Sequence, residues 1–465
     1  MSDLFKKLEK YSNSDYYPYH MPGHKRRLYG EAMKSIAWMD ITEIQGFDNL
    51  HDAKDMLMKM QKKAASIYGA EESFYLINGS TSGILSAVSA ALPQRGKLLM
   101  VRGCHKSAYH AAYLRNLDLK YLWTGQHPEF GCNLAVTVQQ VEEALLHDKS
   151  IQAVFIVTPT YEGLIADVEK IAEVAHKRGI PLIVDEAHGA HLGFHPAWAR
   201  NSARLGADLV INSLHKTLAA PTQTAILHVN GTLINREKLK RFLGIYQSSS
   251  PSYPLIAGME EAIEITASVK ENLFGDFLNH WNTMLNQLQI CQCIHILQES
   301  NSDIGKLVFG DKTGSLTGQQ LYEILLHRYH LQIEMTAGSY VLAMFTVADT
   351  KEGYDRLTKA LLEIDGECRG RKARTHKTET LVKPRQIYSL AEAWDMESED
   401  ILLEKAQGRL SGSFINLYPP GIPLIVPGEE FTEDICISLQ GYSKRGFYVQ
   451  GVREFNNRTF IKALK

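Results

Sequence analysis

The sequence lacks long apolar runs and has almost no net charge, and both absences narrow the kinds of protein that it can encode. None of its apolar runs reaches the roughly 18 residues that a membrane-spanning helix needs. The N-terminal stretch MSDLFKKLEKYSNSDYY has no apolar core of the kind that a secretory signal carries. The formal net charge of −2 gives no overall positive field that would attract nucleic acid or an anionic membrane. We therefore expect a cytoplasmic protein that has neither a membrane nor a nucleic acid as its partner.

Cysteine is also scarce, with six residues in a chain of 465. Their uneven spacing is unlike that of a disulfide framework, which favours a reduced protein. Cys291 and Cys293, with His295 close by, form the one group whose spacing suits a metal, but no second pair lies at the right spacing. The sequence therefore predicts no metal site at these cysteines.

The stretch PLIVDEAHGAHLGFH (181–195) places the letters DEAH after an apolar run, as in one group of helicases. A helicase of that kind needs a G-x-x-x-x-G-K-[ST] loop, whose backbone amides bind the phosphates of the nucleotide. No stretch of the sequence matches this loop, since QRGKL and DIGKL share only its Gly-Lys pair. The missing loop excludes the helicase hypothesis.

The same stretch holds His188, His191 and His195, whose spacing would place them on one face of a helix. Two glycines interrupt the stretch and a proline follows it, which favours a loop over a helix that carries metal ligands. We therefore expect no metal here, and Asp185 is left for another role.

Apolar strand-like runs alternate with amphipathic helical stretches over the first half of the chain. The runs are SFYLIN (73–78), KLLMVRG (97–103), QAVFIVT (152–158), PLIVDEA (181–187), DLVINS (208–213) and TAILHV (224–229). This alternation predicts an α/β fold with a mainly parallel sheet covered on both faces. Five of the strands end in a polar cluster: NGSTSG, CHKS, TPTYEG, DEAH and SLHK. Because ligands bind at the carboxyl ends of the strands in such sheets, we expect the clusters to form one site.

Changes in composition suggest how the chain divides. We expect an N-terminal arm and interface segment at 1–60, a large cofactor-binding domain at 61–255, a small α+β domain at 256–366, a basic linker at 367–386 and a C-terminal α+β domain at 387–465. Seven Lys and Arg lie between residues 369 and 385, with Glu379 as the one acid. A nucleic-acid patch and a solvated linker are both compatible with this stretch, and the balanced overall charge favours the linker.

A lysine follows the next strand after Asp185, because DLVINSLHKTLAAP places Lys216 between His215 and Thr217. A surface lysine is usually a solvated charge, but burial among apolar and hydroxyl neighbours would lower the pKa of this amine and make it nucleophilic. A nucleophilic lysine, a carboxylate at a strand end and a Gly/Ser/Thr turn at a helix start are the groups that pyridoxal 5′-phosphate needs. The sequence therefore predicts this cofactor.

Each of these groups has an expected role. The expected phosphate ligands are Ser80, Thr81, Ser82, Ser213 and His215. His105 would lie flat against the pyridine ring. Asp185 would stay ionised beside the ring nitrogen so that the ring withdraws electrons, and His188 would orient Asp185 or contact the oxygen of the ring.

In their order and combination the motifs resemble those of the short-form bacterial ornithine/lysine/arginine decarboxylases, PLP-dependent enzymes of aspartate-aminotransferase fold (fold type I). The resemblance is carried by HMPGHK (20–25), DITE (40–43), NGSTSG, CHKS, DEAHGAH, SLHKT, QSSSPSYPLIAGME (247–260) and YPPGIPLIVPGE (418–429). It implies decarboxylation of lysine, arginine or ornithine to the amine and CO2, by a homodimer or higher homo-oligomer with active sites at the subunit interface. Arg26 and Arg27 depart from the family, which commonly has small residues after GHK.

The resemblance also implies roles for particular residues. Carried over by motif, Lys216 would hold the cofactor as a Schiff base, Asp185 would pair with the ring nitrogen and His105 would stack on the ring. The phosphate would be held by Ser80, Thr81, Ser213 and His215. The segment SSSPSYP (248–254) would lie near the site of the neighbouring subunit.

Some alternatives stay open at this point. Another PLP reaction, such as transamination or β-elimination, and a catalytically silent regulatory homologue are rivals to the decarboxylase, although the silent homologue predicts a broken lysine or aspartate. A basic substrate side chain needs an acidic partner. The candidates are Asp40, Glu43, Asp48 and Glu334. The preferred amino acid, the size of the oligomer, and a role in polyamine synthesis or in acid resistance stay open as well.

Overall fold

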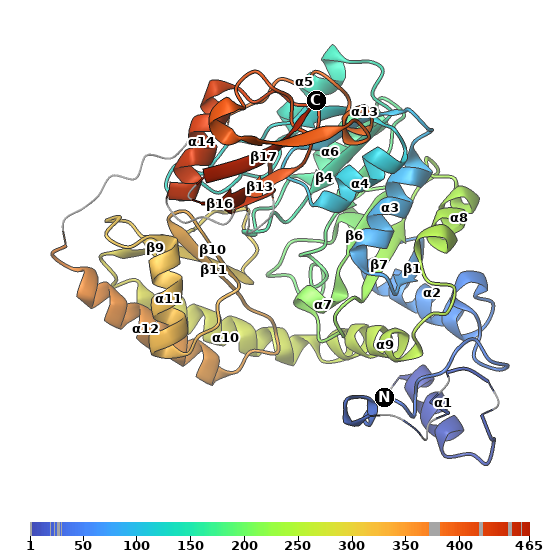
Figure 1. Cartoon of the computed structure of the whole chain (residues 1–465). Coiled ribbons are helices and arrows are strands. Elements are labelled where there is room, and N and C mark those ends of the chain that lie inside the picture. The colour runs from blue at the N-terminus through green and yellow to red at the C-terminus, as the bar shows by residue number, and fades with distance from the viewer. Residues whose placement is uncertain are drawn as a thin grey trace. The chain divides into compact units, whose positions relative to one another are not determined.

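The computed structural model of the chain comprises two compact units (Figure 1). The described residues are 2–18, 20–22, 24–25, 28, 30–371, 382–417, 422–444, 449–456 and 458–465. The first unit is Met1–Ala91, Asp167–Asn279 and Thr346–Ala348, and the second is Leu92–Ala166, His280–Phe345 and Asp349–Lys465. Outside the described residues lie Arg26, Arg27, residues 372–381 of the basic stretch and residues 418–421 of YPPGIPLIVPGE. The domain boundaries expected from the sequence remain a prediction.

Four strands form the sheet of the first unit, in the order β1-β7-β6-β5. They are β1 (Glu72–Leu76), β5 (Leu182–Asp185), β6 (Leu209–Asn212) and β7 (Ala225–Val229). Strands β5 and β6 are parallel, and β7 is antiparallel to both β6 and β1. Every residue of β5, β6 and β7 is buried, as expected for strands that are covered on both faces. Because β1, β5 and β6 run in one direction, their carboxyl ends share one edge of this sheet.

The helices of the first unit follow the apolar periodicity of the sequence. They are α1 (Asp3–Ser12), α2 (Met56–Tyr68), α3 (Gly79–Ala91), α6 (Val168–His176), α7 (Leu214–Thr217), α8 (Arg236–Tyr246) and α9 (Tyr253–Ser268), with the short 3-10 helices η1 (Glu31–Met33), η2 (Leu50–Asp52) and η3 (Ser202–Leu205). Helix α6 is typical: Asp167 caps its first turn by accepting from the backbone N–H of Lys170, and its buried face repeats Val168, Ile171 and Ala175.

The second unit contains three parallel strands in the order β4-β2-β3. They are β2 (Lys97–Val101), β3 (Asp118–Leu122) and β4 (Ala153–Val157), with α4 (Lys106–Leu114) following β2 and α5 (Val138–His147) preceding β4. Strand β3 was not among the runs expected from the sequence. It ends this strand order, and its exposed Asp118 and Lys120 interrupt the apolar pattern that identified the other strands.

Two further parts of the second unit follow in the chain. Helix α10 (Lys270–Leu288), whose residues 270–279 are counted with the first unit, leads into the antiparallel sheet β10-β11-β9-β8. This part consists of β8 (Ile294–Ile296), β9 (Lys306–Asp311), α11 (Gly318–Tyr329), β10 (Met335–Ala337), β11 (Tyr340–Met344) and α12 (Lys351–Cys368). The last part consists of α13 (Leu390–Trp394), β12 (Ser398–Leu402), η4 (Leu403–Lys405), β13 (Ile415–Leu417), β14 (Ile422–Ile425), α14 (Glu433–Lys444), β15 (Val449–Gln450), β16 (Arg453–Phe455) and β17 (Arg458–Leu464).

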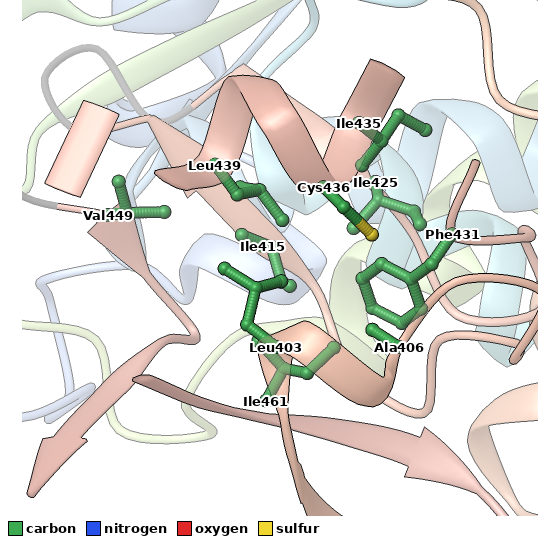
Figure 2. Packing of buried hydrophobic residues seen from close by; sticks show 10 residues of the cluster. All are labelled: Leu403, Ala406, Ile415, Ile425, Phe431, Ile435, Cys436, Leu439, Val449 and Ile461. Atoms are coloured by element: carbon green, nitrogen blue, oxygen red, sulfur yellow. The ribbon is translucent and has the colours of Figure 1, made fainter. Parts of the chain in front are cut away.

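The segment from residue 387 to the C-terminus has a hydrophobic core of its own (Figure 2). Helix α14 contributes Ile435, Cys436 and Leu439, and the ring of Phe431 is fully buried beside them. The remaining members are Leu403, Ala406, Ile415, Ile425, Val449 and Ile461. This core draws on elements spread over about 60 residues, so the segment can hold its shape through its own packing.

A buried carboxylate fastens the ends of β5 and β6 to each other. Glu186, directly after β5, accepts from Nδ2 of Asn212 at the end of β6, at 2.9 Å. The same carboxylate accepts from the side-chain amide of Asn201 and from the hydroxyl and backbone N–H of Ser202 at the start of η3. Burial raises the pKa of Glu186 to about 7, and the hydrogen bonds from Ser202 and Asn212 oppose that rise.

Within the described part of the chain, no helix is both long and apolar enough to cross a membrane.

We expect Phe431→Ala to loosen the C-terminal core, because a buried Phe→Ala change costs about 3–5 kcal/mol in lost burial and cavity formation. The measurement is hydrogen exchange of the β13 and β17 amides, which reports opening of this core without a two-state assumption for the whole chain. Phe455, which is 64% exposed, supplies the matched control, and Phe455→Ala should change protection by less than about 0.5 kcal/mol. Equal loss of protection in the two variants would contradict the conclusion that Phe431 stabilises the C-terminal core.

The free energy of unfolding should fall as pH rises through about 7, because the folded pKa of Glu186 lies above the unfolded value of about 4.3. The stabilisation is complete below the unfolded pKa and is lost as the buried group ionises. Glu186→Gln removes the titrating proton and should therefore gain stability relative to the wild type between about pH 5 and about pH 8. Thermal midpoints of both proteins across this range test the expectation, and a difference that does not change with pH would refute it.

Candidate active site

The polar clusters lie where the sequence predicted, at the ends of strands. In the first unit, NGSTSG begins α3 after β1, DEAH begins with the last residue of β5, and SLHK follows β6 into α7. These three clusters share the carboxyl edge of the first unit's sheet. In the second unit, CHKS follows β2 and TPTYEG follows β4, which is parallel to β2.

Lys216 is the central group of the first unit's cluster. It lies in the short helix α7 and is half-buried, and its Nζ lies 3.1 Å from Nε2 of His188. This contact was not predicted, since the sequence suggested His188 as a partner for Asp185 or for the ring of the cofactor. With an ammonium on Lys216, Nε2 of His188 must be the acceptor, so the two side chains can exchange a proton.

Asp185 lies buried at the end of β5, where one of its oxygens accepts from the backbone N–H of Ala187 at 3.1 Å. Burial raises the pKa of Asp185, and the positive charge of Lys216 opposes the rise. A buried carboxylate of this kind is stabilised as an anion by a nearby cation, such as a protonated pyridine ring.

The start of α3 offers backbone amides and hydroxyls. Ser80 is half-buried and Thr81 is exposed, whereas Ser82 is buried and donates its hydroxyl to the carbonyl of Gly79 at 2.9 Å. A side chain at Gly83 would collide with Leu76 of β1, at 2.5 Å, so glycine allows this helix start to approach the sheet closely. Helix N-termini of this kind bind anions.

Two buried hydroxyls near Lys216 lack partners. The Oγ of Ser213 and the Oγ1 of Thr217 have no hydrogen-bond partner among the residues that the structure describes. His215 donates from Nδ1 to the carbonyl of Thr224 at 2.9 Å, so its other ring nitrogen, Nε2, is the one that a ligand could use. Buried polar atoms are nearly always paired, so unpaired hydroxyls beside a lysine fit a bound group rich in oxygen. The donors therefore suit the phosphate of pyridoxal 5′-phosphate.

His105 is described within the second unit, as the residue that caps the start of α4. Its Nδ1 accepts from the backbone N–H of Ser107 at 3.3 Å and lies 2.8 Å from the hydroxyl of that residue. These contacts orient the ring through its Nδ1 atom. His105 is exposed.

The four acids considered for a basic side chain differ in their surroundings. Asp48 accepts from the backbone N–H groups of Asn49, Lys54, Asp55 and Leu57, and these bonds lower its pKa despite burial. Both of its carboxylate oxygens therefore already accept hydrogen bonds from the backbone. Asp40 lies 3.3 Å from Nε2 of His24, and Glu334 accepts from the hydroxyl of Tyr161 at 2.5 Å. Glu43 is exposed, and no hydrogen bond or ion pair joins it to another described residue.

The segment with three histidines is a series of turns, as the sequence indicated. Over the described residues, no group of three or more His, Cys, Asp or Glu side chains is arranged to hold a metal ion.

The hydrogen-bond network around Glu186 was not predicted from the sequence. Its acidic member stands next to Asp185, but the partners Asn201 and Asn212 carry no signal that links them to it.

Two family models match the chain. One described as "Orn/Lys/Arg decarboxylase, major domain" matches residues 2–307, and one described as "Orn/Lys/Arg decarboxylase, C-terminal domain" matches residues 370–444. The chain is 29% identical to the arginine decarboxylase of Bacillus subtilis (strain 168), over 96% of this chain and 95% of that protein. It is 24% identical to the constitutive lysine decarboxylase of Escherichia coli (strain K12), over 87% of this chain and 70% of that protein.

Solved structures show the same fold. The lysine decarboxylase LdcF of Francisella novicida matches with a TM-score of 0.85 at 19% identity, covering 99% of this chain and 81% of that one. This likeness confirms the α/β fold that the sequence predicted. The family match covers more than half of the sequence and includes all the clusters of the site, and the chain belongs to the Orn/Lys/Arg decarboxylase family.

Proposed function

We propose that the protein is a pyridoxal-phosphate-dependent decarboxylase that converts a basic L-amino acid, arginine, lysine or ornithine, into the corresponding amine and CO2. The observation that carries the proposal is the set of Lys216, His188 and buried Asp185 at one sheet edge of a chain in this family. The relatives named arginine decarboxylase and lysine decarboxylase support a basic substrate. By analogy with its family, we place the protein in the cytoplasm as a homodimer or larger homo-oligomer.

Different residues of the first unit would bind different parts of the cofactor. Lys216 would hold it covalently, while Ser80, Thr81, Ser213 and His215 would bind its phosphate. Ser82 keeps its hydroxyl on Gly79 and would contribute its backbone amide. When bound, pyridoxal phosphate supplies an electron-withdrawing ring conjugated to the α-carbon of the substrate.

Asp185 would keep a positive charge on the ring nitrogen. Its burial makes the pairing strong, because the anion has little water to solvate it and a low local dielectric strengthens the attraction of opposite charges. By its motif, His105 would lie against the face of the ring, with its orientation set by Ser107.

His188 and Lys216 would handle the proton that replaces the carboxylate. With substrate bound, Nζ of Lys216 would accept or deliver a proton, and Nε2 of His188 lies within hydrogen-bond reach of Nζ, at 3.1 Å. The two groups together can therefore return a proton to the α-carbon after CO2 leaves.

A product assay tests the proposed function. The purified protein with pyridoxal phosphate is incubated separately with L-lysine, L-arginine and L-ornithine, and the products are identified by mass spectrometry. Cadaverine, agmatine or putrescine would establish both reaction and substrate. Keto acids, or no product from a protein that holds the cofactor, would refute the decarboxylase proposal.

Lys216→Ala should abolish the visible absorbance of the covalently bound cofactor and the release of CO2, because no other described residue of the cluster offers a primary amine. Absorbance spectra of the purified variant with added pyridoxal phosphate provide the measurement. Lys240→Ala is the matched control, since Lys240 is an exposed lysine on α8 of the same unit that pairs with Glu237. The mechanism fails if Lys216→Ala keeps the absorbance and full activity.

A further inference from the structure

A buried ion pair joins the end of β2 to the C-terminal segment, by which we mean residues 387–465. The guanidinium of Arg102 donates from Nη1 and Nη2 to the two carboxylate oxygens of Glu429, at 2.7 and 2.8 Å. The side chains are only 4% and 1% exposed. The rings of Tyr121 and Trp123 lie 4.8 and 5.0 Å from the guanidinium, and the N–H of Val426 donates to Glu429. The two-point geometry fixes the direction of both side chains.

The same C-terminal segment packs along helix α4. The ring of Phe414 meets Tyr109 edge-on at 5.5 Å, and the ring of Trp394 stacks on His110 at 5.8 Å. Trp394 also contacts Tyr113 at 4.9 Å. The hydroxyl of Tyr113 donates to Asp395 at 2.7 Å, so successive turns of α4 rest on residues 394–414.

His105 lies between these two attachments. It caps the start of α4 and follows Arg102 by three residues. The hydroxyl of buried Tyr109 donates to the carbonyl of Arg102 at 2.7 Å, and the N–H of Cys104 donates to the carbonyl of Val101, which closes the turn. A movement of either attachment would therefore turn the ring of His105.

Stability alone does not explain the ion pair. Burying two charges is costly, and apolar side chains of similar size often stabilise a protein as well or better. What an apolar pair cannot supply is the fixed two-point geometry between strand β2 and the C-terminal segment.

We propose that the C-terminal segment, residues 387–465, positions His105 for the cofactor, through the Glu429–Arg102 pair at one end of the β2–α4 turn and through Trp394 and Phe414 on α4. The proposal rests on the proposed function, because it gives His105 the ring of pyridoxal phosphate as its target. Glu429 and Trp394 are thus positioning residues that act through His105.

A double-mutant cycle separates positioning from general stability. Glu429→Gln keeps the shape of the side chain but removes its charge, and we expect it to weaken pyridoxal phosphate binding to the apoprotein about tenfold. In a His105→Ala background the same change should alter the dissociation constant by less than about twofold, because the residue to be positioned is gone. Glu399→Gln is the matched control: its pair with Arg409, at 2.8 Å, is solvent-exposed and should leave binding unchanged.

A second variant covers the case in which Glu429→Gln does not fold. Trp394→Leu leaves the ion pair intact, and it should weaken binding in the wild-type background but not in the His105→Ala background. It should also change the circular dichroism of the bound cofactor, which reports the orientation of the ring.

Equal weakening by Glu429→Gln in both backgrounds, or no weakening in either, would overturn the positioning role. An unchanged dissociation constant for His105→Ala itself would overturn it as well. Failure of the wild-type protein to bind pyridoxal phosphate at all would be a different result, because it would refute the proposed function.

Discussion

The parallel pairing of β5 and β6 is the constraint on which the site depends. It brings the last residue of β5, Asp185, and the residues after β6, Ser213 to Lys216, to one edge of the sheet. Parallel strands alone do not fix how the chain leaves the sheet. The carboxylate of Glu186 does so here, because it accepts from Asn212 on one side and from Asn201 and Ser202 on the other. Glu186, which joins the two strand ends, therefore lies next to Asp185, for which we propose a role in binding the cofactor. Burial raises the pKa of both carboxyl groups.

The difference between these two neighbouring acids lies in their donors. Glu186 is surrounded by amides and hydroxyls of the protein, so its environment is complete without any further group. Asp185 has one backbone donor and the charge of Lys216. An acid that is buried with so few partners is costly to ionise unless another cation joins it. Asp185 is thus suited to a cationic ring, whereas Glu186 is suited to holding two strand ends together.

The sequence predicted those features that depend on local pattern. Buried strands such as β5 and β6 were found because each of their residues is apolar up to the polar end, and the turns around His188 were found because of their glycines. Strand β3 was not predicted from the sequence, because an edge strand tolerates charged side chains that interrupt the apolar pattern. The contact of Lys216 with His188 and the pair of Arg102 with Glu429 join residues 28 and 327 positions apart, and nothing in the local sequence of either residue encodes its partner. Asp48 was considered as a substrate ligand because its charge is visible in the sequence, whereas the four backbone donors that occupy it are not.

On our proposal, the C-terminal segment acts on His105 from a distance, through the strand and the helix on either side of that residue. Its own core, built around Phe431, makes it a firm support (Figure 2). Glu429 comes four residues after the end of β14, whose last residue, Ile425, belongs to this core. A firm support matters because a ring that stacks on a cofactor gains from the contact only when its orientation is already fixed before binding. His105 is exposed at the turn before α4, where its Nδ1 contacts the backbone N–H and the hydroxyl of Ser107. On our proposal, further rigidity comes from the strand before His105 and the helix after it, because both are attached to the C-terminal segment.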